Sequence, residues 1–348
     1  MSRQQTEEEM NYIAKFILGI FTLLAGSCSR QQRSPQLPDI VFHDACYPYV
    51  QLWQGNYYAT IQPRQGDSII LYTSRDPRQL GEGRSRLIWH DSRMKHIWSP
   101  ELHRLNSKWY LYFEADDGNT DNHQLYVLEN SSDDPMKGEF QMKGVITTND
   151  EWNFGLHPTS IVVRGQQYLL WSGWQHRRSE TETQCIYIAR MRNPWTLDSE
   201  RVLLSQPDLE WERQWINPDG LRSNYPIFVN ENPEVFLTDD GRHVCVCYSA
   251  SGIWTVYHVL GMLTAPSDAD LLNPSSWTKS KEPLFIGQSS RSDSLYSCSN
   301  ISLAPTADGK GYWLFYEANS VDDAGAQHRD IHLRPLAWNS DGLPDFSK

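Results

Sequence analysis

Three residues with side chains that exchange protons stand just before a proline that recurs along the chain. Tyr47 precedes Pro48, His157 precedes Pro158, and Glu231 is followed by Asn232-Pro233. A phenol, an imidazole and a carboxyl can serve as acids, bases or nucleophiles when a fold brings them together. The residue types therefore indicate acid–base or nucleophilic chemistry, provided that these distant positions share one site.

The recurring proline opens a pattern that is typical of a β-hairpin. A short apolar strand is followed by a polar turn, usually with glycine, and then by an aromatic or β-branched strand. Copies start at Pro48, Pro100, Pro158 and Pro233, and a fifth copy over 301–318 lacks the proline. Five hairpins at blade-sized intervals predict an all-β fold, a five-bladed β-propeller. A β-sandwich would not explain five spaced copies.

A propeller would bring the candidate residues together. The first strand of each blade lines the central channel, so the residues before each proline converge on one funnel. These positions are Tyr47, Ser99, His157, Glu231-Asn232 and Asn300.

Composition narrows the class of partner. The 348 residues include 31 basic and 43 acidic side chains, a formal net charge of −12, and 12% aromatic residues. An acidic surface disfavours nucleic acid or an anionic membrane as partner. The aromatic content excludes low-complexity disorder and suits a protein that meets sugars. We expect an oligosaccharide or polysaccharide as partner, and a monomer.

The N-terminal segment carries an export signal. An apolar run over 16–26 is too short to span a bilayer, and small residues follow it up to Cys28. We expect residues 1–27 to form a signal peptide of the lipoprotein type, with Cys28 lipidated and 28–38 a tether. The propeller domain would then cover 39–348, anchored in the envelope of a Gram-negative bacterium by lipid alone. The other five cysteines have no CxxC spacing, so no zinc site is expected.

Several motifs resemble one known family. From about Asp44 to the C-terminus the chain is similar to glycoside hydrolase family 43, and most of all to its exo-acting α-L-arabinofuranosidases. The motifs lie at 97–103 (IWSPELH), 108–113 (KWYLYF), 168–174 (YLLWSGW), 230–233 (NENP) and 338–346 (WNSDGLPDF). The resemblance implies a five-bladed propeller that hydrolyses arabinose- or xylose-containing glycans.

The resemblance also implies a catalytic set. The family inverts configuration with a basic Asp in blade 1, a tuning Asp in blade 3 and an acidic Glu in blade 4. The Glu matches Glu231, whereas the two Asp positions fall on Tyr47 and His157. A blade 5 histidine at a central ion or water site falls on Asn300. We therefore expect Glu231, His157 and Tyr47 to be catalytic and Trp98, Glu101 and Asn300 to bind substrate. No metal is expected, although the resemblance allows a calcium ion in the channel.

Three interpretations of this set stay open. The chain can be a hydrolase whose base comes from elsewhere, or a glycan-binding relative without turnover. It can also use Tyr47 and His157 as a new pair, in a lyase-like or altered glycosidase reaction. Fold alone does not choose among them.

Overall fold

The computed structural model describes residues 39–63, 67–176, 182–216, 220, 226–284, 295–319 and 329–347. The predicted signal peptide, Cys28 and the tether lie outside these ranges. Within them, no helix has the length and apolar character needed to cross a membrane.

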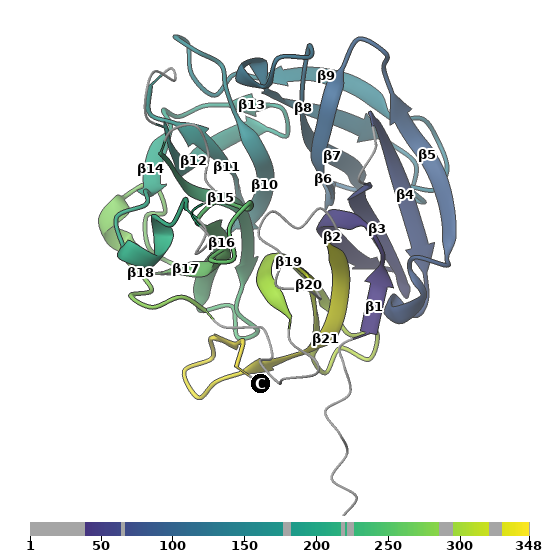
Figure 1. Cartoon of the computed structure of the whole chain (residues 1–348). Helices are drawn as coiled ribbons and strands as arrows, with labels where there is room; N and C mark the ends of the chain where they lie inside the picture. Colours follow the sequence, from purple (N-terminus) through teal and green to yellow (C-terminus); the bar gives the residue numbers. More distant parts are fainter. Residues whose placement is uncertain are drawn as a thin grey trace, which may run out of the picture. The chain divides into compact units, whose positions relative to one another are not determined.

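The strands form five blades arranged around a centre (Figure 1). Blade 1 contains β2 (Ala45–Trp53), β3 (Asn56–Pro63), β4 (Ser68–Ser74) and β5 (Arg84–His90). Blade 2 contains β6 (Lys95–Leu105), β7 (Lys108–Asp116), β8 (Gln124–Asn130) and β9 (Gln141–Ile146). Blade 3 contains β10 (Leu156–Val163), β11 (Gln166–Trp174), β12 (Glu182–Asn193) and β14 (Val202–Ser205), with β13 (Thr196–Leu197) on β12.

The last two blades complete the ring. Blade 4 contains β15 (Ile227–Leu237), β16 (His243–Ala250), β17 (Val259–Pro266) and β18 (Thr278–Lys279). Blade 5 contains β19 (Tyr296–Pro305), β20 (Tyr312–Asn319), β21 (Asp330–Trp338) and, as its outermost strand, β1 (Asp39–Phe42). The short β22 (Pro344–Asp345) pairs with β21. Single 3-10 turns connect some strands: η1 (Pro77–Gln79), η2 (Thr120–Asn122), η3 (Glu210–Glu212) and η4 (Pro274–Ser276).

The five inner strands are the first strands of the predicted hairpins. Each of β2, β6, β10, β15 and β19 contacts the next around the ring, and β19 contacts β2. The ring is also closed by pairing of the N-terminal β1 with β21. Blades 3 and 4 are joined further by parallel pairing of β12 with β15. The predicted five-bladed β-propeller is confirmed.

Turn chemistry explains why the hairpins form locally. In three blades only two residues separate the inner strand from the second strand, and both have positive φ. These pairs are Gln54-Gly55, Asn106-Ser107 and Arg164-Gly165. Positive φ at both positions defines the type I′ turn, whose twist matches that of the flanking strands.

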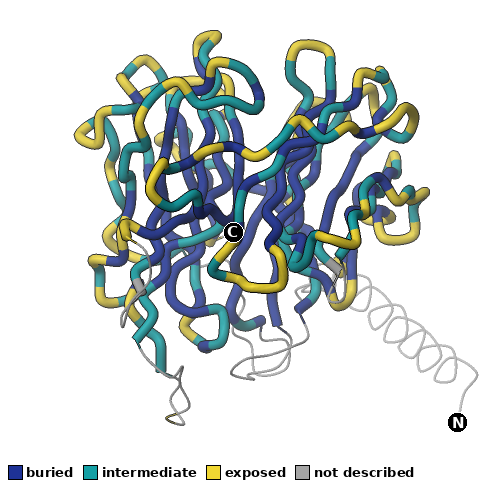
Figure 2. The backbone as a smooth tube through the Cα atoms, turned by 90° about the horizontal axis from the view of Figure 1, so that it is seen from above, coloured by how far each residue is buried: buried dark blue, intermediate teal, exposed yellow. Residues whose placement is uncertain are grey.

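Apolar side chains fill the spaces between neighbouring blades. The second strands supply the bulkiest of these, including Trp109 and Trp171, which are fully buried. One apolar cluster joins residues of blades 1 and 2, and others join each later pair, with Val41 and Phe42 of β1 in the cluster between blades 5 and 1. Buried positions concentrate in the strands and exposed ones in the connecting loops (Figure 2). Burial of apolar area between blades thus fixes the positions of the inner strands.

Candidate active site

Every inner strand carries one residue in the left-handed conformation at the recurring position. The φ angles are 50° at Tyr47, 44° at Ser99, 52° at His157, 49° at Asn232 and 41° at Asn300. The pairing register with the second strand shifts at each of these places. Such a bulge bends the strand and redirects a side chain. Non-glycine residues with positive φ are uncommon, and strained residues of this kind cluster at functional sites.

In two blades, a side chain of the preceding blade accepts a hydrogen bond from the backbone amide of the left-handed residue. This bond supports the bulge. Ser172 Oγ accepts a hydrogen bond from the amide of Asn232 at 3.0 Å, and Ser249 Oγ accepts one from Asn300 at 3.1 Å. Both serines lie on second strands, opposite the residue that precedes the left-handed one. The same register position holds a carboxylate in two other blades.

Those two carboxylates are Glu114 on β7 and Glu317 on β20. Both are fully buried. Glu114 lies behind His157, with 3.5 Å between its Oε1 and Nδ1 of the imidazole. The backbone amide of Tyr47 donates to Glu317, so this carboxylate supports Tyr47. Burial raises the pKa of both carboxyls. In each case the charge of a nearby cationic or imidazole group lowers that pKa by a smaller amount.

His157 lies at the centre of the assembled groups. Its Nδ1 is 2.7 Å from Ser99 Oγ, and its Nε2 is 3.5 Å from Oε2 of Glu231. The ring contacts that of Tyr47, with 5.0 Å between centroids. Burial by itself lowers the pKa of His157, but the charges of Glu114 and Glu231 outweigh it and raise that pKa above its usual value.

Glu231 is largely buried, with 12% of its side chain exposed. Gln184 Nε2 donates a hydrogen bond of 3.0 Å to its Oε2. Burial by itself raises the pKa of Glu231, but hydrogen bonding to His157 and the charge of that residue lower it overall. Glu231 is therefore ionised near neutral pH, and the exchangeable proton of the pair rests on His157.

Tyr47 stays a phenol in the free protein. Burial raises its pKa well above the usual value, and the carboxylates Glu231 and Glu317 raise it further. Tyr47 is partly exposed. Tyr47 is thus placed to donate a hydrogen bond, and it carries no activated phenolate.

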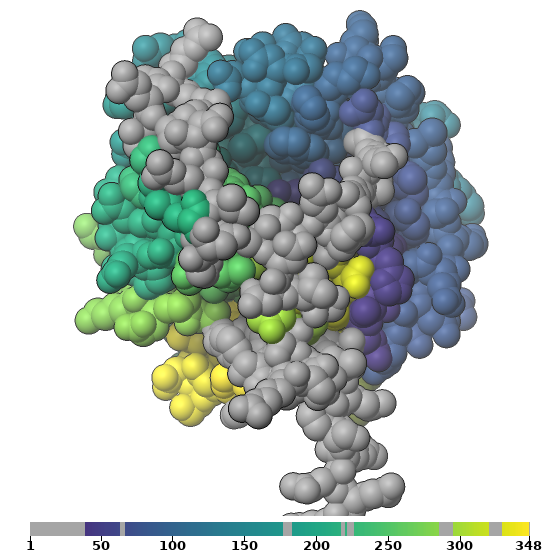
Figure 3. Space-filling model, in the orientation of Figure 1, coloured from purple at the N-terminus to yellow at the C-terminus, as the bar shows by residue number. Residues whose placement is uncertain are grey.

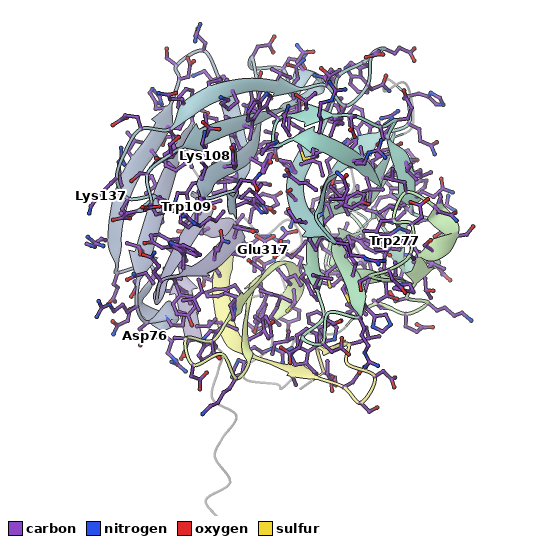
Figure 4. The ribbon with its side chains drawn as sticks, turned by 180° about the vertical axis from the view of Figure 1, so that it is seen from behind. Asp76, Lys108, Trp109, Lys137, Trp277 and Glu317 are labelled. Carbon is purple, nitrogen blue, oxygen red and sulfur yellow. The ribbon has the colours of Figure 1, made fainter. Side chains whose placement is uncertain are left out.

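Blade 5 contributes a neutralised carboxylate and an amide. Arg329 Nη1 lies 3.6 Å from Glu317 and donates to Ser299 Oγ at 3.1 Å. Seen from behind, Glu317 lies near the centre of the ring, whereas Lys137 lies at its periphery (Figure 4). Asn300 Oδ1 accepts from Ser249 Oγ at 2.7 Å, while its buried Nδ2 has no partner among the described residues.

A second set of ionisable side chains lies further along the inner strands. Residues two positions after the left-handed ones face the same way in a strand. They include Glu101, which is buried and 2.9 Å from Nε2 of His103, and Glu234. Burial raises the pKa of Glu101 well above its usual value and that of Glu234 to about 8, and it lowers the pKa of His103 to about 3. Glu101 thus lies below the group around His157.

Trp98 lies at the side of the funnel. It is half-buried, contacts the ring of His123 with 4.5 Å between centroids, and packs against Phe154, Leu156 and Trp174. The substrate-binding roles of Trp98, Glu101 and Asn300 stay predictions.

In the described part of the chain, no group of three or more His, Cys, Asp or Glu side chains is arranged to hold a metal ion. The donor Nδ2 of Asn300 would also repel a cation. The absence of a resident metal stays a prediction.

Comparison with known proteins decides the family. Residues 40–344 match the model of the glycosyl hydrolases family 43. The chain belongs to this family. It is 32% identical to an extracellular exo-α-(1→5)-L-arabinofuranosidase of Streptomyces avermitilis, over 95% of this chain and 68% of that protein. It is 33% identical to α-L-arabinofuranosidase B of Pyricularia oryzae, over 84% of this chain but only 59% of that protein.

Solved structures of family 43 agree with the fold. The crystal structure of an α-L-arabinofuranosidase from Lactobacillus brevis has a TM-score of 0.78 and 29% sequence identity. The match covers 90% of this chain and 96% of that one. Family 43 membership and these relatives support a glycosidase, a hydrolase of O-glycosyl bonds.

Sequence reasoning predicted that the residues at the recurring position converge. The structure places Tyr47, Ser99 and Glu231 in contact with His157. Asn300 contacts Ser249 of the preceding blade.

Sequence reasoning missed Glu114 and Glu317. A signal was present, because the second strands of four hairpins end in FEA, WSG, YSA and YEA, which align Glu114 and Glu317 with the two supporting serines. Alignment of the hairpins alone would have revealed the shared position, although not which side chain it supports.

Proposed function

We propose that this chain removes terminal α-L-arabinofuranosyl groups from arabinose-containing glycans. The arabinofuranosidases to which it is similar support this substrate class. The observation that carries the proposal is the pairing of Glu231 with His157, with 3.5 Å between Oε2 and Nε2. The pair can give one proton to a glycosidic oxygen that binds beside it.

The proton donor in this proposal is the pair, with the proton initially on His157. As the bond between the anomeric carbon and the leaving oxygen breaks, the proton passes from His157 to that oxygen, directly or through Glu231. Water adds to the anomeric carbon, its proton passes to bulk water, and the pair of His157 and Glu231 takes up a proton from solvent for the next turnover. Glu114 holds His157 in its protonated form, and Gln184 orients Glu231.

The attacking water molecule receives little general-base catalysis in this arrangement. Tyr47 stands where the family resemblance places the basic Asp, and its raised pKa keeps the phenol protonated. A general base contributes roughly 10²–10⁴-fold to rate. We therefore expect slow hydrolysis, with Tyr47 and Asn300 binding sugar hydroxyls.

The protonated Tyr47 also favours a second candidate function, which is glycan binding without turnover. In that case the funnel would hold an arabinofuranosyl end without breaking its bond. The same residues would bind, and Glu231 would matter only through its hydrogen bonds.

One experiment separates the two. Hydrolysis is measured with an arabino-oligosaccharide, whose leaving group must be protonated, and with 4-nitrophenyl α-L-arabinofuranoside, whose leaving group departs as an anion. Glu231→Gln should lower kcat/KM on the oligosaccharide by roughly 10²–10⁴-fold and much less on the aryl substrate. Equal losses on both would contradict the proton-donor role. Calorimetric binding by the parent protein with no product from either substrate would establish the second candidate.

The site of action in this proposal is outside the cytoplasm. Two similar arabinofuranosidases are extracellular proteins. We further propose that lipidated Cys28 anchors a monomer to the cell envelope.

A further inference from the structure

A second cavity lies beside the funnel, on the outer part of blade 2. Its volume is about 500 Å³. Three loops contribute to its lining: the loop before β6, the loop after β7 and the loop before β10. These loops lie on the face that carries the left-handed residues, since those residues are near the starts of the inner strands. Figure 3 views the molecule in the orientation of Figure 1 and shows the surface hollowed toward the middle of the ring.

The charges in this cavity suit a neutral ligand. Arg93 Nη2 lies 2.7 Å from Asp91, and Asp117 accepts hydrogen bonds of 3.1 Å from Asn122. Hydrogen bonds from Arg93 lower the pKa of Asp91 to about 2, and those from Asn122 lower that of Asp117. Both carboxylates therefore stay ionised, and they outnumber the single arginine of the lining. An anionic sugar such as a uronate would be repelled.

Aromatic surface is held rigidly in the same cavity. Trp152 is half-buried and stacks on Phe154, with 4.8 Å between centroids, and Tyr126 stacks on Phe113 at 5.5 Å. Both Trp152 and Tyr126 line the cavity. Fixed aromatic rings beside a few polar groups form the kind of lining that binds a small organic ligand in a set orientation. Sugar rings present both apolar C–H faces and hydroxyl groups.

A series of side-chain contacts connects the cavity to the group around His157. Asp116 lines the cavity and lies 2.8 Å from Nδ1 of His96 and 3.1 Å from Nδ1 of His123. The ring of His123 contacts Trp98, which directly precedes Ser99, the partner of His157. These contacts place the cavity next to the group around His157.

We propose that the cavity is a binding subsite for a neutral sugar of the glycan that carries the scissile arabinofuranosyl group. This inference rests on the proposed function. The subsite contacts the part of the substrate beyond the leaving oxygen, so it governs affinity for long glycans and leaves the reaction at the anomeric carbon unchanged.

The test measures binding by calorimetry in a Glu231→Gln background, in which oligosaccharide hydrolysis should be slowed roughly 10²–10⁴-fold. The ligands are methyl α-L-arabinofuranoside, which fills the funnel alone, and a neutral arabino-oligosaccharide. Trp152→Ala and Arg93→Ala should each weaken oligosaccharide binding about tenfold and leave the methyl glycoside unaffected. Arg242→Ala is the matched control, because Arg242 pairs with Asp240 two residues earlier, as Arg93 does with Asp91, in a turn of blade 4. It should change neither affinity.

The outcomes separate the two proposals. Unchanged oligosaccharide affinity in both cavity variants, with the methyl glycoside still bound, overturns the subsite alone. Equal weakening of both ligands also overturns it, because the cavity would then act through the funnel or the fold. Failure of the parent background to bind either ligand overturns the proposed function together with the subsite.

Discussion

Replacing Glu114 by Gln should shift the pH range in which the enzyme works. Glu114 is fully buried and its Oε1 lies 3.5 Å from Nδ1 of His157, the same distance that separates Nε2 from Glu231. The substitution thus removes one of two carboxylates placed symmetrically about the imidazole, and it keeps the size of the side chain.

The expected magnitude follows from this distance. Opposite charges about 4 Å apart interact by about 4 kcal/mol at an effective dielectric constant of 20. Measured changes are smaller, and one neighbouring charge alters a protonation equilibrium by roughly 10- to 1,000-fold. Because Glu114 raises the pKa of His157, its loss lowers that pKa and the imidazolium is lost at lower pH. The activity of Glu114→Gln should therefore fall roughly 10- to 1,000-fold at alkaline pH and approach that of the parent at acid pH.

The assay is kcat/KM for arabino-oligosaccharide hydrolysis as a function of pH. Glu114→Asp keeps the charge and should keep the alkaline limb near its original position. Ser172→Ala removes the support of the bulge at Asn232 without a change of charge, so any loss should be uniform across pH. If turnover is too slow, the imidazole nitrogen chemical shifts of His157 report the same titration. An unshifted titration in Glu114→Gln would refute the reasoning.

Three further predictions follow from other parts of the chain. Tyr47→Asp should raise kcat/KM on arabinofuranosides by roughly 10²-fold or more, because it places a base at a left-handed position that Asp tolerates better than Tyr; unchanged rates would show that the base is not the missing element. Arg329→Ala should lower the free energy of unfolding in urea by about 3–5 kcal/mol, because it leaves buried Glu317 without its cation. The raised folded-state pKa of Glu317 makes that loss smaller at acid pH, where the carboxyl is protonated in both states, and larger as pH rises; a pH-independent loss would contradict the ion-pair argument. Cys28→Ala should leave the protein in the soluble fraction, and membrane association equal to that of the parent would exclude the lipid anchor.

The sequence was sufficient for the fold because the repeat is local. Each hairpin copy contains its own strands and turn, so five copies can be recognised without knowledge of any distant contact. The closing strand was not foreseen. β1 spans only four residues and becomes part of blade 5 through pairing with β21, almost three hundred residues later. Nothing in so short a segment indicates its partner.

For the candidate site, too, one part was predictable from the sequence and another part was not. Residue types and their place before the recurring proline determined by themselves that Tyr47, His157 and Glu231 would meet in one funnel. The protonation of those groups was decided by tertiary structure alone. Glu114 reaches His157 from the second strand of the preceding blade, and Glu317 reaches the backbone of Tyr47 across the closure of the ring. A pKa depends on the charges and the burial around a group, and packing between blades sets both.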